Sequence, residues 1–517
     1  MIPVLDARGM RAADAETIRA GVASDVLMEN AASALCEELR RRFPRWKRVV
    51  VVCGPGNNGG DGLAAARMLA QRGLSILLFT LQDPSAYTGD PAANVSRVRA
   101  AGVSLEPLTS AGGFARLRQA LSDCDGVVDA LFGTGLTRPL EGGARRAVEA
   151  INATGKPVVA ADVPSGVSAD RGALLGAAVR ASLTVSFGAP KACHVFPPAS
   201  EVCGCVAVAD IGIPRKTLAK RARRLWLAEE QDVRALLPPR PLNSHKADFG
   251  RLAIVAGARG KVGAAVLVAR GALRGGAGLV TVFCAASLEA TIVTALPEAM
   301  TSGLPEADGS ISESAAKALI RALRDFDAAV LGPGLGTSAA TVRFLAAALK
   351  GARLPIVADA DCLNAFAGRP EVFARRRAPT ILTPHPGEAA RLLRRSSRQI
   401  QEDRLGAARM LARRSRAVVI LKGAHSLIAD PSGEVIVNPT GTPLLATAGS
   451  GDVLAGLIGA LVSGGLPPKD AAVAATWLHG SAAEALRSRL GDAGALAHEV
   501  ADALPAVRRR LGRPRDP

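Results

Sequence analysis

Aromatic side chains are scarce in this chain of 517 residues. Phe, Trp and Tyr make up only 3% of the sequence, with a single tyrosine. Because proteins bind single-stranded nucleic acid by stacking bases on aromatic rings, this scarcity argues against such a surface. The net charge is +18, and the basic residues fall in short clusters such as Arg40–Arg42 and Arg508–Arg510. We interpret the clusters as solvated helix faces whose field favours an acidic nucleotide substrate, and we expect no nucleic-acid partner.

Long apolar runs are also absent from the sequence. The longest candidate, Val453 to Leu466, is short and interrupted by glycine, whereas a membrane-spanning helix needs about 20 apolar residues. The segment Met1 to Ala20 carries charges throughout and has no apolar signal core. These absences predict a soluble, cytoplasmic protein without a membrane partner.

Cysteine is sparse, with eight residues in the whole chain, which fits reduced thiols rather than a disulfide framework. One group, Cys193-His194 and Cys203-Gly204-Cys205, contains residue types that bind metals. Its spacing matches no standard zinc motif, and cysteine is often simply a buried residue. We therefore favour a structural role for this group.

The length and the hydrophobic content indicate two α/β domains. A chain of 517 residues exceeds what one core accommodates, and 49% hydrophobic residues suit buried parallel sheets. Alternation of predicted strands and helices lapses between Trp226 and Asp248, around the run Pro238-Pro239-Arg240-Pro241. We expect one domain over 1–225, a linker over 226–245 and a second domain over 246–517, both with parallel sheets.

A glycine-rich motif follows the first buried strand. Val49 to Cys53 is typical of the strand, Gly54 to Gly62 (GPGNNGGDG) of a loop, and Leu63 to Arg72 of a helix. This arrangement brings backbone amides against a nucleotide pyrophosphate, although the spacing fits neither G-x-G-x-x-G nor a P-loop. The two Asn and the Asp add oxygen ligands for a ribose or a cation.

Polar residues recur where later strands of the first half end. Gly133-Thr134-Gly135 follows one predicted strand, and Asp162 and Lys191 lie near the ends of two others. A doubly wound sheet binds its ligand at such strand ends. Asp162 is our candidate acid/base group. Lys191 is either its electrostatic helper or an ordinary surface lysine.

The most informative motif is Thr447-Ala448-Gly449-Ser450-Gly451-Asp452, which runs into the apolar segment Val453 to Val462. A small-residue turn at a helix start leaves backbone N–H groups free for a phosphate. Asp452 could take a proton from a substrate hydroxyl beside that phosphate. Alternatively, it is only an Asp near a helix cap, which is a common arrangement.

Four further motifs follow predicted strands of the second half: Gly332-Pro333-Gly334-Leu335-Gly336, Asp359-Ala360-Asp361, Thr383-Pro384-His385-Pro386-Gly387-Glu388 and Lys422-Gly423-Ala424-His425-Ser426. With the Gly-Ser-Gly-Asp turn, they resemble the ribokinase-like fold and, within it, the NAD(P)H-hydrate dehydratases.

The first half resembles the NAD(P)H-hydrate epimerase domain. The motifs that carry this resemblance are Asn57-Asn58-Gly59-Gly60-Asp61-Gly62, Asp129, Gly133-Thr134-Gly135 and Asp162-Val163-Pro164-Ser165-Gly166. Fused in this order, the two halves resemble the bifunctional NAD(P)H-hydrate repair enzymes of bacteria over nearly the whole chain. The resemblance implies a Rossmann-like three-layer α/β/α domain followed by a ribokinase-like α/β domain.

The activity implied by the resemblance is repair of hydrated NADH and NADPH, called NADHX and NADPHX. The first domain would interconvert the R and S epimers with a potassium ion. The second would dehydrate the S epimer with Mg²⁺ and ADP, giving AMP and phosphate. We also expect a homo-oligomer.

The resemblance assigns site residues in the first domain. Asp162 and Lys191 would be catalytic, and Asn58, Asp129 and Ser165 would hold potassium. The substrate would be lined by Asn57, Asn58, Gly59, Gly60, Asp61, Gly133, Thr134, Gly135, Leu136, Thr137, Arg138, Pro139 and Asp162.

In the second domain, the resemblance makes Asp452 the catalytic base. The hydrate would contact Ala264, Gly334, His385 and Asp452, and the nucleotide would contact Lys422, Gly423, Ala424, His425, Ser426 and Gly451. The chain departs from the usual pattern at Thr442-Pro443-Leu444-Leu445, where the family shows Asn-Pro-Gly-Met, and at Lys261–Ala264. An alternative reading is a ribokinase-like small-molecule kinase with a non-catalytic N-terminal nucleotide-binding module.

Overall fold

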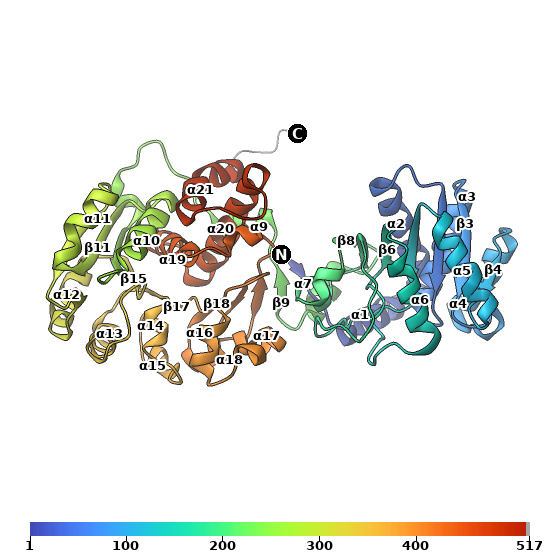
Figure 1. Cartoon of the computed structure of the whole chain (residues 1–517), viewed down its shortest axis with the longest axis horizontal. Coiled ribbons are helices and arrows are strands. Elements are labelled where there is room, and N and C mark those ends of the chain that lie inside the picture. The colour runs from blue at the N-terminus through green and yellow to red at the C-terminus, as the bar shows by residue number, and fades with distance from the viewer. Residues whose placement is uncertain (513–517) are drawn as a thin grey trace. The chain divides into compact units, whose positions relative to one another are not determined.

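The computed structural model describes residues 1–512, which form two compact units. The N-terminal unit comprises residues 2–225, and the C-terminal unit begins at Trp226. Each unit contains a β-sheet with helices on both faces (Figure 1). The α/β fold class expected from the sequence is confirmed in both.

The N-terminal sheet has seven strands in the order β4-β3-β2-β5-β6-β7-β8. Its strands are β2 (Arg48–Cys53), β3 (Ser75–Thr80), β4 (Leu105–Pro107), β5 (Gly126–Ala130), β6 (Val158–Ala161), β7 (Leu183–Phe187) and β8 (Cys205–Ala209). All adjacent pairs are parallel. The strand order reverses between β2 and β5, and a doubly wound sheet binds its ligand at such a switch point.

Alternating side chains of β2 build the two halves of the N-terminal core. Val49 and Val51 pack with helices on one face, whereas Val50 and Val52 pack with helices on the other. The first face carries α1 (Ala7–Arg19), α2 (Ser24–Arg42), α3 (Asn57–Gln71), α4 (Gly89–Ala100) and α8 (Arg215–Arg221); the second carries α5 (Ala111–Asp123) and α6 (Gly142–Ala153). The unit is therefore the expected three-layer sandwich.

The glycine-rich motif differs from its sequence-based prediction. Helix α3 begins at Asn57 instead of Leu63, so most of the expected loop is helical. A Cβ added to Gly59 would lie 1.9 Å from the Gly54 carbonyl oxygen, and one added to Gly62 would lie 2.4 Å from Ala130 Cβ. These glycines let α3 approach the sheet closely, which a propensity-based reading of Gly-Gly as a loop misses.

The C-terminal sheet runs in the order β9-β20-β19-β18-β17-β16-β15-β10-β11-β12. Its strands are β9 (Leu225–Leu227), β10 (Arg251–Val255), β11 (Leu279–Ala285), β12 (Met300–Leu304), β15 (Ala328–Leu331), β16 (Ile356–Ala358), β17 (Thr380–Leu382), β18 (Val418–Leu421), β19 (Leu427–Ala429) and β20 (Val435–Val437). The pairs from β12 to β18 are parallel, but β18-β19 and β19-β20 are antiparallel. The expectation of a wholly parallel sheet is wrong here, because short connections join antiparallel strands directly.

Helices cover both faces of the C-terminal sheet (Figure 1). One face carries α9 (Glu230–Leu236), α10 (Val262–Gly275), α11 (Glu289–Ala295), α19 (Ser450–Ser463), α20 (Pro468–Leu490) and α21 (Ala497–Gly512). The other carries α12 (Ala316–Ala322), α13 (Ala339–Gly351), α14 (Asp361–Asn364), α15 (Glu371–Ala374), α16 (Pro386–Leu393), α17 (Ser397–Glu402) and α18 (Arg404–Ser415). Helix α19 packs between α10 and α20, which explains why its residues from Val453 to Ser463 are all buried.

Part of the expected linker is structured. Helix α9 lies within 226–245, and its Val233 is fully buried in the C-terminal core. Within that range, residues 237–245 and the two residues 228–229 lack helix and strand. The proline run correctly predicts this stretch. Helix α9 before it has only seven residues, which is too short for an amphipathic pattern to be recognised.

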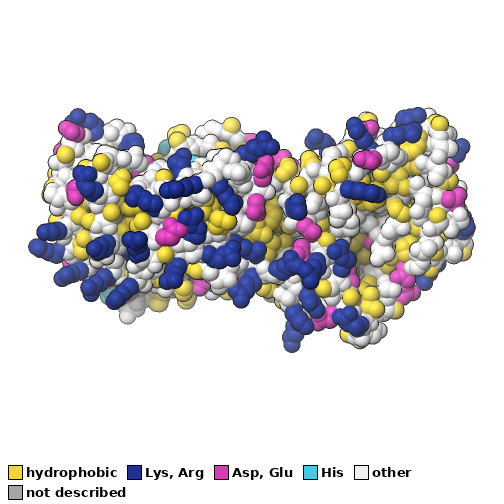
Figure 2. Space-filling view, turned by 90° about the horizontal axis from the view of Figure 1, so that it is seen from below, with side chains coloured by type: hydrophobic (Ala, Val, Ile, Leu, Met, Phe, Trp, Pro, Cys, Tyr) yellow, Lys and Arg dark blue, Asp and Glu magenta, His cyan; other side chains and the backbone are white. Residues whose placement is uncertain are grey.

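Charge is spread over the surface. Figure 2 shows Lys and Arg side chains scattered over the visible face of both units, with fewer Asp and Glu side chains between them. Within residues 1–512, every helix is too short or too polar to span a lipid bilayer.

The close approach of α3 generates a stability prediction. Gly59→Ala should destabilise the N-terminal unit by about 1–3 kcal/mol, because the new methyl carbon would force the backbone at Gly54 to shift. Gly112→Ala on α5 is the control, because the nearest atom to its Cβ lies 3.7 Å away, and it should be neutral or slightly stabilising. Hydrogen–deuterium exchange over residues 48–71 measures the difference; equal protection in both variants would contradict this packing.

Two candidate active sites

A cavity of about 470 Å³ opens where β2, β5, β6 and β7 end. Of the expected substrate-binding residues, the lining includes Asn57, Asn58, Asp61, Gly133, Thr134, Gly135, Leu136 and Asp162, together with Lys191. Gly59 and Gly60 are instead buried within the helix packing, and Thr137, Arg138 and Pro139 do not line this cavity. The site therefore forms at the switch point of the sheet, with a shorter lining than expected.

A buried ion pair organises this cavity. The Lys191 ammonium donates to Asp162 Oδ1 at 2.5 Å and to the Phe187 carbonyl at 2.8 Å. The Phe187 N–H also donates to Asp162 Oδ1, at 2.9 Å. Lys191 is 0% exposed, so its interpretation as a surface lysine is wrong. A buried charge needs such a partner, and the pair fixes the orientation of the Asp162 carboxylate.

The backbone at Asp162 adopts an unusual conformation. Its φ is +62°, in the left-handed region that residues other than glycine visit rarely. Its N–H donates to the Val185 carbonyl of the neighbouring strand at 2.8 Å. Aspartate tolerates this conformation better than most residues, and such positions cluster at functional sites.

A second set of polar residues is hydrogen-bonded to the backbone of Phe132, a residue of the cavity lining. The Ser165 N–H and hydroxyl donate to the two oxygens of Asp129 at 2.8 Å and 2.6 Å, and the Phe132 N–H donates to Ser165 Oγ at 2.9 Å. Burial raises the pKa of Asp129 to about 6, opposed by the hydrogen bonds from Ser165. Asn58 lies beside Gly133, the residue that follows Phe132, since a Cβ added to Gly133 would lie 3.1 Å from Asn58 Oδ1.

These residues can be tested for fit to a hard cation. Asn58, Asp129 and Ser165 present amide, carboxylate and hydroxyl oxygens, which are the ligand types such cations prefer. The Asn58 amide nitrogen is buried and has no hydrogen-bond partner among the described residues. Turning that amide over would place an oxygen at the unsatisfied position, since the two orientations differ only in assignment. The residues present therefore fit a cation such as potassium.

The Cys/His group has structural contacts. His194 Nδ1 accepts the Lys191 N–H at 3.0 Å, and burial lowers the pKa of this histidine to about 3. Cys203 donates its thiol hydrogen to the Ala199 carbonyl, with Sγ 3.2 Å from that oxygen, while Cys205 is exposed on β8. Among residues 1–512, no three His, Cys, Asp or Glu side chains are arranged as a metal site. His194 helps to position Lys191.

The C-terminal site forms where the loops after β16, β17 and β18 meet the start of α19. The Lys422 ammonium donates to Asp359 Oδ1 at 2.9 Å and lies 3.9 Å from Glu388. Thr383 donates to the same Asp359 oxygen at 2.7 Å. A Cβ added to Gly451 would lie 3.2 Å from the Lys422 ammonium nitrogen, which shows how close the glycine turn comes.

Asp452 lies in the first turn of α19, beside this charged group. Helix α19 is capped by Gly449 at φ +86° without a side-chain hydrogen bond, and the Asp452 carboxylate has no hydrogen-bond partner among residues 1–512. It is therefore not a helix cap. Burial raises the pKa of Asp452 to about 7, with Asp359 raising it further and Lys422 opposing. A carboxyl with this pKa can exchange a proton near neutral pH.

The other expected residues of this half adjoin the same site. His385 is the cap of α16, where its Nδ1 accepts the Gly387 N–H at 3.0 Å, and its side chain is 49% exposed. Burial, followed by Lys422, lowers the pKa of His385, which therefore stays neutral. Ala264 and Gly334 face each other, since a Cβ on Gly334 would lie 3.1 Å from Ala264 Cβ.

Arg404 packs against the loop Lys422–Ser426 and supports it by hydrogen bonds. Arg404 is buried, donates to the carbonyls of Leu421 and His425 at 3.4 Å, and would collide with any side chain on Gly423. Both Gly423 and His425 have positive φ. The loop that follows β18 is thus a tight, supported turn, with Lys422, Ala424 and Ser426 in it.

Comparison with known proteins supplies the family. One family model, described as YjeF-related protein N-terminus, matches residues 24–193, and another, described as NAD(P)H-hydrate dehydratase, matches residues 252–506. A bifunctional NAD(P)H-hydrate repair enzyme of Moorella thermoacetica is 40% identical over 494 residues, covering 95% of this chain and 93% of the relative. The chain belongs to the bifunctional NAD(P)H-hydrate repair enzymes.

A second curated relative leads to the same family. The repair enzyme of Escherichia coli is 34% identical over 483 residues, covering 93% of this chain and 89% of the relative. A solved ADP/ATP-dependent NAD(P)H-hydrate dehydratase from Bacillus subtilis, co-crystallised with ATP and Mg²⁺, is 33% identical. It covers 55% of this chain and 98% of its own, with a TM-score of 0.49.

Sequence motifs missed one part of this repair enzyme's N-terminal site. Helix α1 supplies Met10, Arg11 and Asp14 to the cavity, and Phe132 and Phe187 also line it. Helix α1 contains none of the motifs that follow predicted strands. A signal was nevertheless present, because Asp14 lies beside Met10, Ala13 and Thr17, which form the buried stripe of an otherwise ordinary amphipathic helix.

Proposed function

We propose that residues 1–225 interconvert the R and S epimers of hydrated NADH and NADPH, and that residues 246–517 dehydrate the S epimer with ADP. The observation that carries the proposal is that a bifunctional repair enzyme matches 95% of this chain, and that each unit of the chain holds a site with acid–base groups. AMP and phosphate are the other products. We further propose that the protein is a homo-oligomer in the cytoplasm; light scattering that finds only a 52.9 kDa species would contradict the oligomer.

Epimerisation requires the hydroxyl to leave and return at the ring carbon next to the nitrogen. The nitrogen lone pair stabilises the cation formed when the C–O bond breaks. In the proposed reaction, Asp162 exchanges a proton with that hydroxyl or with the returning water. Lys191 holds Asp162 in place through their hydrogen bond at 2.5 Å. Asn57, Asn58, Asp61 and the loop from Gly133 to Leu136 surround the substrate.

Dehydration needs a better leaving group than hydroxide. In the proposed reaction, Asp452 takes the proton of the hydrate's hydroxyl, whose oxygen attacks the terminal phosphorus of ADP. AMP departs, and elimination of phosphate with loss of a proton from the neighbouring carbon restores the ring double bond. The N–H groups of Gly449 and Gly451 and the Lys422 ammonium stabilise the charge on the transferring phosphoryl group, whereas the Ser450 N–H already donates to the Thr447 carbonyl.

The remaining residues of the second site divide between its two ligands. We assign the loop Lys422–Ser426 and Gly451 to the nucleotide, and Ala264, Gly334 and His385 to the hydrate. The carboxylates of Asp359 and Asp361 offer oxygen ligands for Mg²⁺, which when bound would neutralise phosphate charge.

The direct test follows the absorbance of the reduced nicotinamide after mixing protein, Mg²⁺, ADP and both NADHX epimers. Wild type should recover all the NADH. Asp452→Asn should recover essentially none, because the base is lost, and Asp162→Asn should recover the S fraction promptly and the R fraction slowly. Failure of wild type with ADP and with ATP would overturn the dehydratase, and a stable phosphorylated product would point to a small-molecule kinase.

The proposed base predicts a pH dependence. Asp452 must be ionised to accept a proton, and its pKa is raised to about 7. The kcat/KM for the S epimer should therefore fall tenfold for each unit as pH decreases below about 7, and level off above it. Stopped-flow measurement with the pure S epimer gives this profile. A rate that does not change below pH 7 would exclude Asp452 as the base.

The proposed cation site predicts that epimerisation depends on potassium. Replacing K⁺ by choline at constant ionic strength should slow the recovery of the R fraction, because Asn58, Asp129 and Ser165 would lose their cation. Dehydration of the S epimer serves as the internal control and should not change. Equal rates for the R fraction in the two buffers would rule out a functional potassium ion.

A further inference from the structure

Asp14, Asp61 and Asp162 are three of the four aspartates that line the N-terminal cavity, and among residues 1–512 only the Asp162 carboxyl of these three has a hydrogen-bond partner. Asp162 accepts hydrogen bonds from Lys191 and Phe187, and both bonds end on Oδ1. Asp14 on α1 and Asp61 on α3 line the same cavity, but neither carboxyl has a hydrogen-bond or ion-pair partner among residues 1–512. Partly buried carboxyl groups left without partners in a cavity are available to a ligand.

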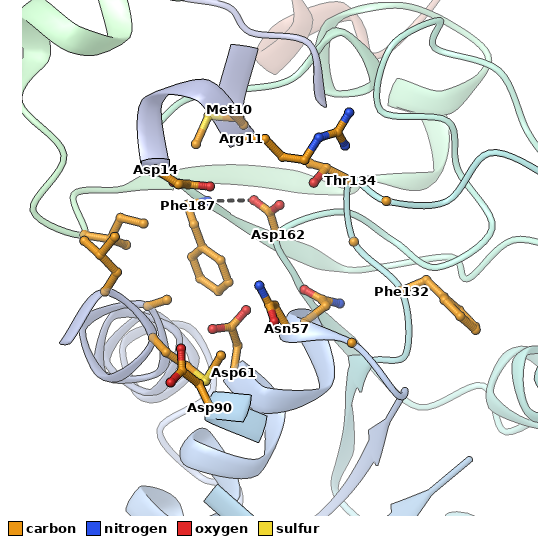
Figure 3. A pocket seen from close by; sticks show the side chains of 18 of the residues that line it. Met10, Arg11, Asp14, Asn57, Asp61, Asp90, Phe132, Thr134, Asp162 and Phe187 are labelled. Atoms are coloured by element: carbon orange, nitrogen blue, oxygen red, sulfur yellow. Dashed lines mark hydrogen bonds between the residues drawn. The ribbon is translucent and has the colours of Figure 1, made fainter. Parts of the chain in front are cut away.

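The three groups come from different elements. Figure 3 shows Asp14 extending from α1 toward Asp162, which enters from the loop after β6. Asp61 enters from α3 on another side of the Phe187 ring. Asp14 and Asp162 therefore face the same part of the cavity, and Asp61 is close enough to both to interact electrostatically with them.

We infer that Asp14 is a second catalytic residue of the N-terminal site, which exchanges a proton with the substrate in concert with Asp162. This inference rests on the proposed epimerase function and adds a residue to it. A single carboxyl group must both protonate the departing hydroxyl and deprotonate the returning water. Two adjacent carboxyl groups that hold one proton between them can perform both steps without waiting for solvent.

The proton balance is as follows. Asp14 donates its proton to the hydroxyl oxygen as the C–O bond breaks, and the bonding electrons leave with the water formed. The ring nitrogen lone pair forms a C=N bond. Water then adds to the other face of this carbon, the lone pair returns to nitrogen, and Asp162 accepts the proton released. In the reverse turnover the roles exchange, so no net proton is consumed.

The electrostatic surroundings support this division of roles. Burial raises the pKa of Asp14 to about 6, with Lys191 opposing and Asp162 adding to the increase. Burial, followed by Asp162 and Asp14, raises the pKa of Asp61 well above its usual range, with Lys191 opposing. Arg11, one turn before Asp14 on α1, and Asp90 on α4 are the other charged residues in the cavity lining. Asp14 can thus change its protonation state near neutral pH.

The test compares Asp14→Asn with Asp90→Asn in the full-length protein. Asp90 lines the cavity from α4, away from Asp14 and Asp162 in Figure 3, and takes no part in the proposed proton transfer, so the second variant controls for loss of a carboxylate. Conversion of the pure R epimer is followed with an excess of separate wild-type dehydratase activity, ADP and Mg²⁺. Asp14→Asn should lower kcat for the R epimer by about 10²- to 10⁴-fold with KM changed only a few-fold. Asp90→Asn should stay within a few-fold of wild type.

The added dehydratase activity must come from a protein whose own epimerase is inactive, and Asp162→Asn supplies it. A pH series gives the second readout. Wild-type kcat/KM for the R epimer should fall as pH rises above about 6, because Asp14 must carry the proton, and this decrease should be missing from the residual rate of Asp14→Asn.

Three outcomes overturn the inference. It is wrong if Asp14→Asn keeps the wild-type kcat, if only its KM changes, or if Asp90→Asn loses as much activity. Circular dichroism and thermal unfolding of both variants show whether a lost rate reflects a lost fold, and Asp14→Glu, which restores the carboxyl, should recover part of kcat. Wild type that cannot interconvert the epimers would instead overturn the proposed epimerase itself.

Discussion

Parallel strands end at the same edge of their sheet, and both sites of this chain depend on that constraint. In the N-terminal unit it brings the residues after β2, β5, β6 and β7 around one cavity. In the C-terminal unit it brings Asp359, Glu388 and Lys422 to the start of α19. Residues as far apart in sequence as Asn57 and Lys191 thereby line the same cavity, which no local element could achieve.

Each site then uses one lysine, fully buried at Lys191 and partly buried at Lys422, to organise several carboxyl groups. Lys191 bonds to Asp162, and Lys422 bonds to Asp359. In both sites, a further carboxyl group without a partner has a pKa raised by burial, to about 6 at Asp14 and to about 7 at Asp452. An ionised group held by lysine beside one that titrates near neutrality is an arrangement suited to proton transfer.

Much of the fold follows from local patterns in the sequence. The buried strand β2 is a continuous apolar run, and the strand predicted over Val49 to Cys53 occurs at Arg48–Cys53. Predictions failed where tertiary packing overrides propensity. Helix α3 begins inside a glycine motif because close contact with the sheet requires glycine there, and β19 and β20 are antiparallel because their short connections favour hairpins.

The sequence by itself determined the family, the order of the two units and most of the loops that carry the sites, because those loops are contiguous motifs after recognisable strands. Only the tertiary structure decided which side chains meet. From the sequence, Lys191 could equally be a surface residue, but the fold buries it against Asp162. Asp452 could equally be a helix cap, but its carboxyl has no backbone partner among residues 1–512. Asp14 belongs to a helix with no motif, and its place in the cavity depends on how α1 packs on the sheet, which is a long-range contact that local sequence does not encode.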